Sequence, residues 1–124
     1  MISGAVAALH KRFPDLTGHG LCHPTDVCTG EWTTADLIAE AERFPDQVKT
    51  CVKWLKKCLV LDGYRAEQDT YTYKHEVETW ADEWIAHLSM LVAVQIVGLD
   101  MEVNPAREWA GLLKLGRIRP GALR

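Results

Sequence analysis

The sequence lacks the motifs that identify the commonest enzyme classes. Its 124 residues include only two serines, Ser3 and Ser89, and neither lies in the G-x-S-x-G turn of the α/β-hydrolases. It has no P-loop for nucleotide phosphates and no G-x-G-x-x-G fingerprint for a dinucleotide. These absences argue against a serine hydrolase, a P-loop nucleotidase and a dinucleotide-dependent dehydrogenase. They do not exclude an enzyme of an unfamiliar kind.

Long apolar runs are also lacking. The longest, residues 84–99, contains a histidine and a glutamine and is shorter than the roughly 20 residues that a membrane-spanning helix needs. The short apolar run near the N-terminus is followed by Lys11 and Arg12, whereas a secretion signal has its charges first. We therefore expect a soluble cytoplasmic protein without membrane contact, whose four cysteines are thiols or metal ligands rather than disulfides.

The composition that remains is typical of one globular domain. Hydrophobic residues make up 48% of the chain and charged residues 25%, and no repeat or low-complexity tract is present. A chain of this size buries roughly two-thirds of the surface that it would expose when unfolded, so it needs neither a metal nor a disulfide to fold. We predict a single helical domain over residues 1–124.

Glycine and proline divide the chain into segments with helical periodicity. We predict an all-α fold, a compact bundle of about five helices with a long irregular loop at residues 14–32. Two short stretches, 69–74 and 91–97, also carry strand signals, by alternation in the first and β-branched residues in the second. The five helices are expected over residues 2–13, 33–44, 46–61, 73–98 and 104–115, and the fourth follows a half-polar stretch that begins at residue 64.

Residues 85–97 and Asn104-Pro105 carry two further structural predictions. Residues 85–97 are apolar nearly all round, so we expect them to be buried on several sides or covered by a second copy of the chain. Asn104-Pro105 is a good helix start, with asparagine as the cap and proline at the first helical position. The bundle is therefore built round residues 77–97 and ends in a C-terminal helix.

The segment 46–61 has the clearest amphipathic pattern and the strongest basic face. Its apolar face contains Cys51 and Cys58, which we expect in the core, and four lysines lie opposite. Basic residues beside an aromatic ring are common on nucleic-acid-binding surfaces, and the basic residues after Trp109 form a second such combination. The predicted interaction residues are Lys49, Lys53, Trp54, Lys56, Lys57, Trp109, Lys114, Arg117 and Arg119.

The segment GHGLCHPTDVC, residues 18–28, concentrates histidine and cysteine between glycines and a proline. A structural zinc ion needs four nitrogen or sulfur ligands, so His19, Cys22, His23 and Cys28 form a candidate metal site. The C-x5-C spacing, however, matches none of the common zinc patterns. Three interpretations stay open: a zinc knuckle, a Cys22–Cys28 disulfide, and the ordinary ordered loop that the spacing favours. Zinc is the only cofactor that the sequence suggests.

Glu76, Glu83 and His87 form the one constellation typical of acid–base or metal chemistry. On one continuous helix these three residues fall within about 40° of one another. Helical di-metal centres, however, draw ligands from several helices, and Glu83 with His87 is also a simple surface pair at i, i+4. A solvated helix face is the alternative interpretation.

These observations together favour a binding protein over an enzyme. We predict a non-enzymatic protein–protein interaction module, a subunit of a larger assembly or a small inhibitor acting on one. Trp80 and Trp84 fall on the apolar side of their predicted helix, which is typical of the core, but five tryptophans in a short chain also suit interface anchors. Short motif-free helical chains occur among phage-encoded inhibitors and virion adaptors. The alternatives are a zinc-stabilised nucleic-acid-associated protein and, third, an unrecognised metal-dependent enzyme.

Overall fold

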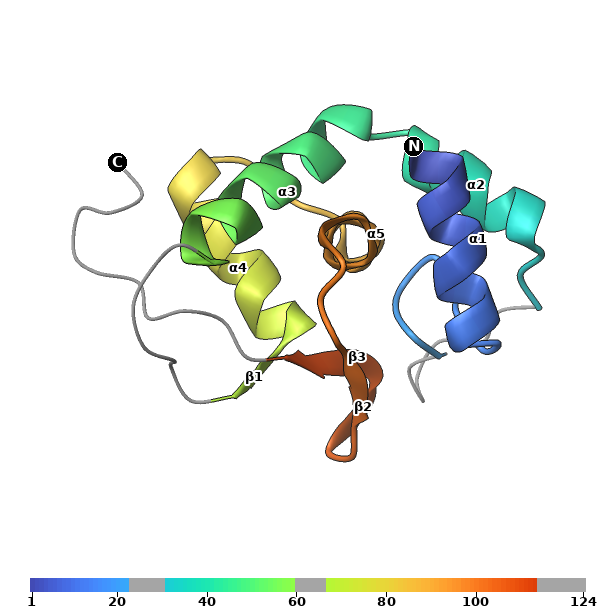
Figure 1. The fold of residues 1–124 in the computed structure, drawn as a ribbon. Helices are drawn as coiled ribbons and strands as arrows, with labels where there is room; N and C mark the ends of the chain where they lie inside the picture. The colour runs from blue at the N-terminus through green and yellow to red at the C-terminus, as the bar shows by residue number, and fades with distance from the viewer. Residues whose placement is uncertain (23–30, 60–66, 114–124) are drawn as a thin grey trace.

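The computed structural model describes residues 1–22, 31–59 and 67–113 (Figure 1). Its second half contains a small three-stranded sheet beside the helices, so the fold is α+β and the predicted all-α bundle is wrong. The elements in chain order are α1 (Ile2–Arg12), α2 (Thr34–Glu42), α3 (Pro45–Leu59), β1 (Gln68–Asp69), α4 (Thr70–Ala81), α5 (His87–Val97), β2 (Glu102–Asn104) and β3 (Arg107–Leu113).

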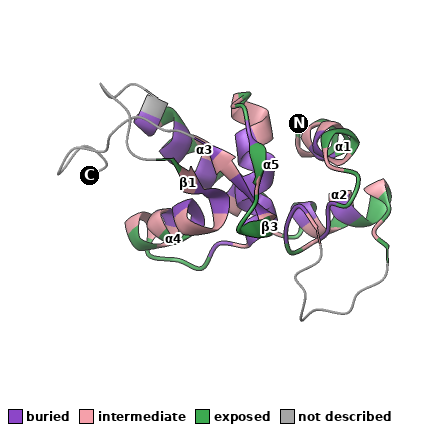
Figure 2. Ribbon diagram, turned by 90° about the horizontal axis from the view of Figure 1, so that it is seen from below, coloured by how far each residue is buried: buried purple, intermediate pink, exposed green. Residues whose placement is uncertain are grey.

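Helix α5 lies at the centre of the molecule (Figure 1). Every residue from His87 to Val94 is buried, as the apolar character of this segment predicts. Helices α3 and α4 pack on one side of it and α1 and α2 on the other, and Figure 2 shows the buried residues concentrated along α5 and the faces turned toward it. Because the chain's own helices cover α5, its apolar surface does not argue for a second copy.

Helices α2 and α3 form where the sequence predicts them. The Thr33 hydroxyl accepts the N–H of Asp36 at 3.1 Å, and the Asp36 carboxylate accepts the N–H of Thr33 at 3.1 Å, so a full capping box starts α2. In α3 the side chains of Cys51 and Cys58 are buried, which confirms their predicted core position. Burial raises the pKa of the Cys51 thiol to about 12, so this cysteine is an inert packing residue.

The predicted C-terminal helix is replaced by a hairpin. Strands β2 and β3 pair antiparallel, and β3 also pairs with β1, which gives a three-stranded sheet of order β1-β3-β2. The Asn104 side-chain oxygen accepts the N–H of Ala106 at 3.0 Å. A helix cap and a tight turn both use this contact, so Asn104-Pro105 fits either structure locally. Strand pairing, which is non-local, decides for the turn.

The single helix predicted over residues 73–98 is divided in two. Asp69 accepts the N–H of Thr72 at 2.8 Å and caps α4 at Thr70, so the alternating stretch 69–74 is helical after a two-residue strand. Asp82 adopts left-handed backbone geometry, with φ of 54°, and ends α4. Helix α5, which starts at His87, is 11 residues long. Among the described residues no helix is long and apolar enough to cross a membrane.

Candidate interaction surface

The candidate zinc ligands lie partly within the described residues. The His19 ring is exposed and sits edge-on to Trp32, with ring centroids 6.2 Å apart. Cys22 is half-buried, and burial, helped by Glu108 and Asp15, raises the pKa of its thiol, which disfavours the thiolate that binds zinc. In residues 1–22, 31–59 and 67–113 no group of three or more metal-binding side chains gathers. His23 and Cys28 lie outside the described residues, so the zinc site stays a prediction.

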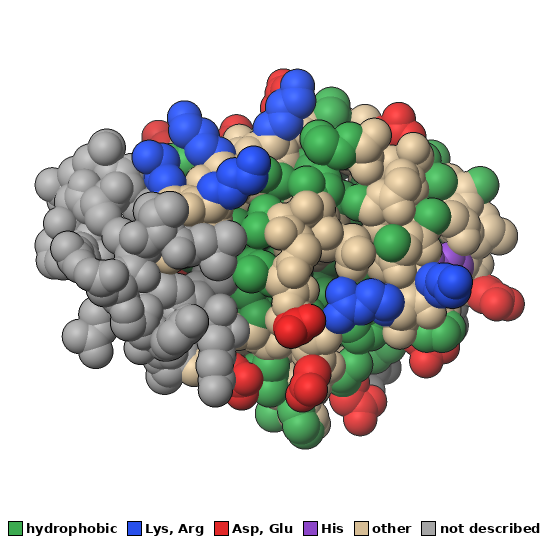
Figure 3. All heavy atoms as spheres, viewed as in Figure 1, with side chains coloured by type: hydrophobic (Ala, Val, Ile, Leu, Met, Phe, Trp, Pro, Cys, Tyr) green, Lys and Arg blue, Asp and Glu red, His purple; other side chains and the backbone are tan. Residues whose placement is uncertain are grey.

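The lysine face of α3 is present, but its aromatic neighbour is not on it. Lys49, Lys53 and Lys56 are exposed and Lys57 is half-buried, and Figure 3 shows basic side chains gathered over α3. Trp54 points the other way and is 0% exposed, so it belongs to the core and is not part of the exposed lysine face. Its indole packs against Tyr73, with ring centroids 5.9 Å apart. The remaining predicted residues Lys114, Arg117 and Arg119 lie outside the described ranges.

The predicted constellation of Glu76, Glu83 and His87 does not assemble. Glu83 is exposed in the turn after α4, whereas His87 is buried at the start of α5. The His87 Nδ1–H donates to the His19 carbonyl at 2.9 Å, because a carbonyl oxygen can only accept. The Thr70 hydroxyl therefore donates to His87 Nε2 at 2.7 Å and accepts the Gly111 N–H at 3.1 Å. We call these four groups the polar junction.

The polar junction holds its histidine neutral. The pKa of His87 is lowered to about 4, mainly by burial and in smaller part by repulsion from Lys74 and His75, while the His19 carbonyl and Asp69 act in the opposite direction. Protonation of Nε2 would also place an N–H against the Thr70 hydroxyl, whose own hydrogen already points there. His87 is therefore a structural hydrogen-bonding residue at neutral pH and has no free nitrogen for a metal or a substrate.

Trp109, another predicted interaction residue, covers the polar junction. Its half-buried indole is edge-on to the ring of His87 at 5.8 Å and to that of Tyr71 at 4.8 Å between centroids. The guanidinium of Arg107 lies over the same indole, 5.8 Å from its centroid. These contacts account for the position of the Trp109 ring by packing within the chain. The role of Trp109 in binding a partner stays a prediction.

Trp84 is the largest of the apolar side chains that lie exposed in the described part of the chain. It lies in the turn of residues 82–86 between α4 and α5, which we call the Trp84 turn, and its side chain is 61% exposed. The neighbouring Ile85 is 0% exposed and anchors the same turn in the core. The Phe44 ring supports the indole edge-on, with centroids 5.7 Å apart. Covering this ring with another molecule would remove apolar surface from water, which is favourable.

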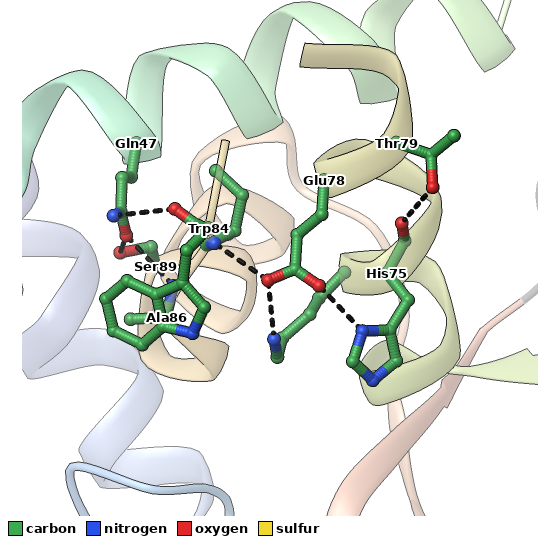
Figure 4. A network of polar contacts seen from close by, with 9 residues as sticks. Gln47, His75, Glu78, Thr79, Trp84, Ala86 and Ser89 are labelled. Atoms are coloured by element: carbon green, nitrogen blue, oxygen red, sulfur yellow. Dashed lines mark hydrogen bonds and ion pairs between the residues drawn. The ribbon is translucent and has the colours of Figure 1, made fainter. Parts of the chain in front are cut away.

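The Trp84 turn is held from α4 by one carboxylate (Figure 4). Glu78 accepts the N–H of Ile85 at 2.9 Å, the Nζ of Lys74 at 3.0 Å and the Nδ1–H of His75 at 2.6 Å. Burial by itself raises the pKa of Glu78, but these three hydrogen bonds outweigh it and the pKa is lowered. Glu78 is therefore ionised at neutral pH and ties the turn to the helix before it.

The Trp84 turn is held from α3 by one amide. The Gln47 side chain donates to the Trp84 carbonyl at 2.9 Å and accepts the N–H of Ala86 at 2.9 Å and the hydroxyl of Ser89 at 3.2 Å. Figure 4 shows Gln47 on one side of Trp84 and Glu78 on the other. The backbone of the turn that carries the exposed indole is thus hydrogen-bonded to α3 through Gln47 and to α4 through Glu78.

We expect Glu78→Gln to lower the free energy of unfolding by about 2 kcal/mol, because it leaves the buried Lys74 ammonium without a carboxylate. Chemical denaturation at pH 7 measures the change. Glu40→Gln is the matched control, since it removes an exposed pair with Arg43 and should change stability by less than about 0.5 kcal/mol. Equal effects of the two substitutions would contradict the role given to Glu78.

The surface beside Trp84 is an open hollow with limited chemistry. Its volume is about 500 Å³. Glu78 orients the His75 ring, as a carboxylate orients a general base in many enzymes. The one hydroxyl in the lining, on Thr79, donates to the His75 carbonyl at 3.1 Å and is not directed at the His75 ring. The described lining therefore offers no activated nucleophile. The lining residues are His75, Glu78, Thr79, Asp82, Glu83 and Trp84.

Comparison of the chain with protein families, with curated proteins and with solved structures finds no match. Sequence reasoning missed the Trp84 turn because it placed Trp84 on the apolar side of one continuous helix. The available signal was the acidic pair Asp82-Glu83, which interrupts the apolar face just before Trp84.

Proposed function

We propose that this chain is a non-enzymatic protein-binding module of the cytoplasm, a subunit of a larger assembly or a small inhibitor acting on one, and that Trp84 is its anchor. The observation that carries the proposal is the 61% exposed indole on an otherwise hydrogen-bonded turn. Tryptophan is enriched among the residues that dominate binding energy in protein interfaces. A turn ordered before binding also loses little conformational entropy when a partner covers it.

We expect Trp84→Ala to weaken binding to a purified protein partner by about 100-fold, as the loss of a buried aromatic anchor does. The free energy of unfolding should fall by at most about 1 kcal/mol, since only the edge contact with Phe44 is lost. Partners are found by comparing proteins retained by the wild-type chain and by the variant, and the affinity is then measured with purified components.

The control for this experiment is Val103→Ala, which removes another exposed apolar side chain, on β2. It should leave the affinity unchanged. A partner that binds the Trp84→Ala and wild-type chains equally well would overturn the proposal, provided that thermal unfolding shows both to be folded.

The runner-up proposal is a zinc-stabilised nucleic-acid-associated protein. The exposed lysines of α3 support it, because cations on one helix face can neutralise phosphates. The same binding measurements separate the two proposals. Affinity that survives high salt favours the Trp84 anchor, whereas affinity for nucleic acid that falls steeply with salt, and a fold lost on chelation, favour the runner-up.

A further inference from the structure

The hollow beside Trp84 combines an aromatic ring with carboxylates that the fold does not neutralise. Glu78 is compensated by Lys74 and His75. Asp82 and Glu83 are exposed, and within the described ranges neither has a cation at ion-pair distance. The hollow therefore presents, next to an indole, two carboxylates that no cation of the described residues pairs with.

This combination complements a cation. The face of an indole attracts an ammonium or guanidinium group, and a guanidinium also forms two parallel hydrogen bonds with a carboxylate. The segment that lines the hollow adds to the negative charge, since residues 76–83 contain four acidic residues and no lysine or arginine. A negative field of this kind draws basic partners toward the hollow.

We propose that the Trp84 hollow binds an arginine side chain of a basic segment in a partner protein, with the guanidinium between the Trp84 indole and the carboxylates of Asp82 and Glu83. This inference rests on the proposed protein-binding function and names the chemistry of its partner. The open shape of the hollow suits one side chain carried on a larger molecule. The hydrogen bond from the Ile85 N–H to Glu78 holds the turn in one geometry, so an arginine side chain would meet the same arrangement each time it binds.

The test is an NMR titration of the ¹⁵N-labelled full chain. The probes are acetyl-Gly-Arg-Gly-amide and its glutamine counterpart, and the readout is the indole N–H signal of Trp84, assigned by its loss in Trp84→Ala. We expect a saturable shift with the arginine probe only. The double variant Asp82→Asn, Glu83→Gln should weaken this binding by about tenfold. Asparagine tolerates the left-handed geometry of position 82, so the turn is kept.

Glu102→Gln, which removes an exposed carboxylate from β2, is the matched control and should leave the titration unchanged. Equal shifts with both probes, or none, would overturn the proposal. So would a Trp84 signal that moves when Arg117 and Arg119 are replaced by glutamine without any probe, since the chain's own basic residues would then be the occupant. Partner binding lost in Trp84→Ala but kept in the double variant would leave the protein-binding function standing and remove the arginine.

Discussion

Acidification from pH 6.5 to pH 4 should cost this protein about 3 kcal/mol of stability through His87 alone. The pKa of His87 is about 4 in the folded chain and 6.5 in the unfolded chain, and each unit of difference is worth about 1.4 kcal/mol. Because the folded pKa is the lower one, the unfolded state binds more protons in this window. The stabilisation is therefore complete above pH 6.5 and is lost as the pH falls toward 4.

The measurement is denaturant unfolding at several pH values for the wild-type chain and for His87→Asn. The variant should be less stable at pH 7 and should lose less stability on acidification, because asparagine does not titrate. His19→Gln is the control: it keeps the backbone carbonyl that accepts from His87, so the acid dependence should persist. If His87→Asn unfolded with the same pH dependence as the wild-type chain, the polar junction would not contain a neutral histidine.

Among glycine-to-alanine substitutions in the described residues, Gly20→Ala should lower the free energy of unfolding the most, by about 3 kcal/mol. A Cβ at this position would meet the carbonyl oxygen of Trp109 at a separation that no real Cβ reaches. The backbone cannot retreat without losing the hydrogen bond from the Leu21 N–H to the same oxygen, which is 2.8 Å long. The loop before Cys22 would separate from β3 and carry the His19 carbonyl with it.

Gly4→Ala is the matched control for Gly20→Ala. Gly4 is exposed in α1, and a methyl group there would have no other atom within 4 Å, so alanine should raise the free energy of unfolding by up to about 1 kcal/mol. Thermal unfolding of the two variants side by side measures both effects. Tolerance of alanine at position 20 within about 0.5 kcal/mol would show that the loop does not sit against β3.

Trp84 and the polar junction illustrate different limits of prediction from sequence. The junction joins Thr70, His87, Gly111 and the His19 carbonyl, which belong to four separate segments, and a hydrogen bond between distant segments leaves no periodic pattern. The Trp84 turn depends on a local event, the left-handed Asp82. Asp is among the residues that tolerate this geometry, but tolerance alone does not show that a helix ends there.

The sequence by itself determined the elements whose patterns are local and strong. The capping residues Thr33 and Asp36, the amphipathic α3 and the apolar α5 were readable because each depends on neighbours within a few turns of the chain. Only the tertiary structure decided which chemically notable residues are accessible. In that structure Trp54 and His87 are buried, Trp84 is exposed, and residues 104–113 belong to a hairpin. Sequence patterns do not show these outcomes, because strand pairing and close packing depend on which distant segments meet.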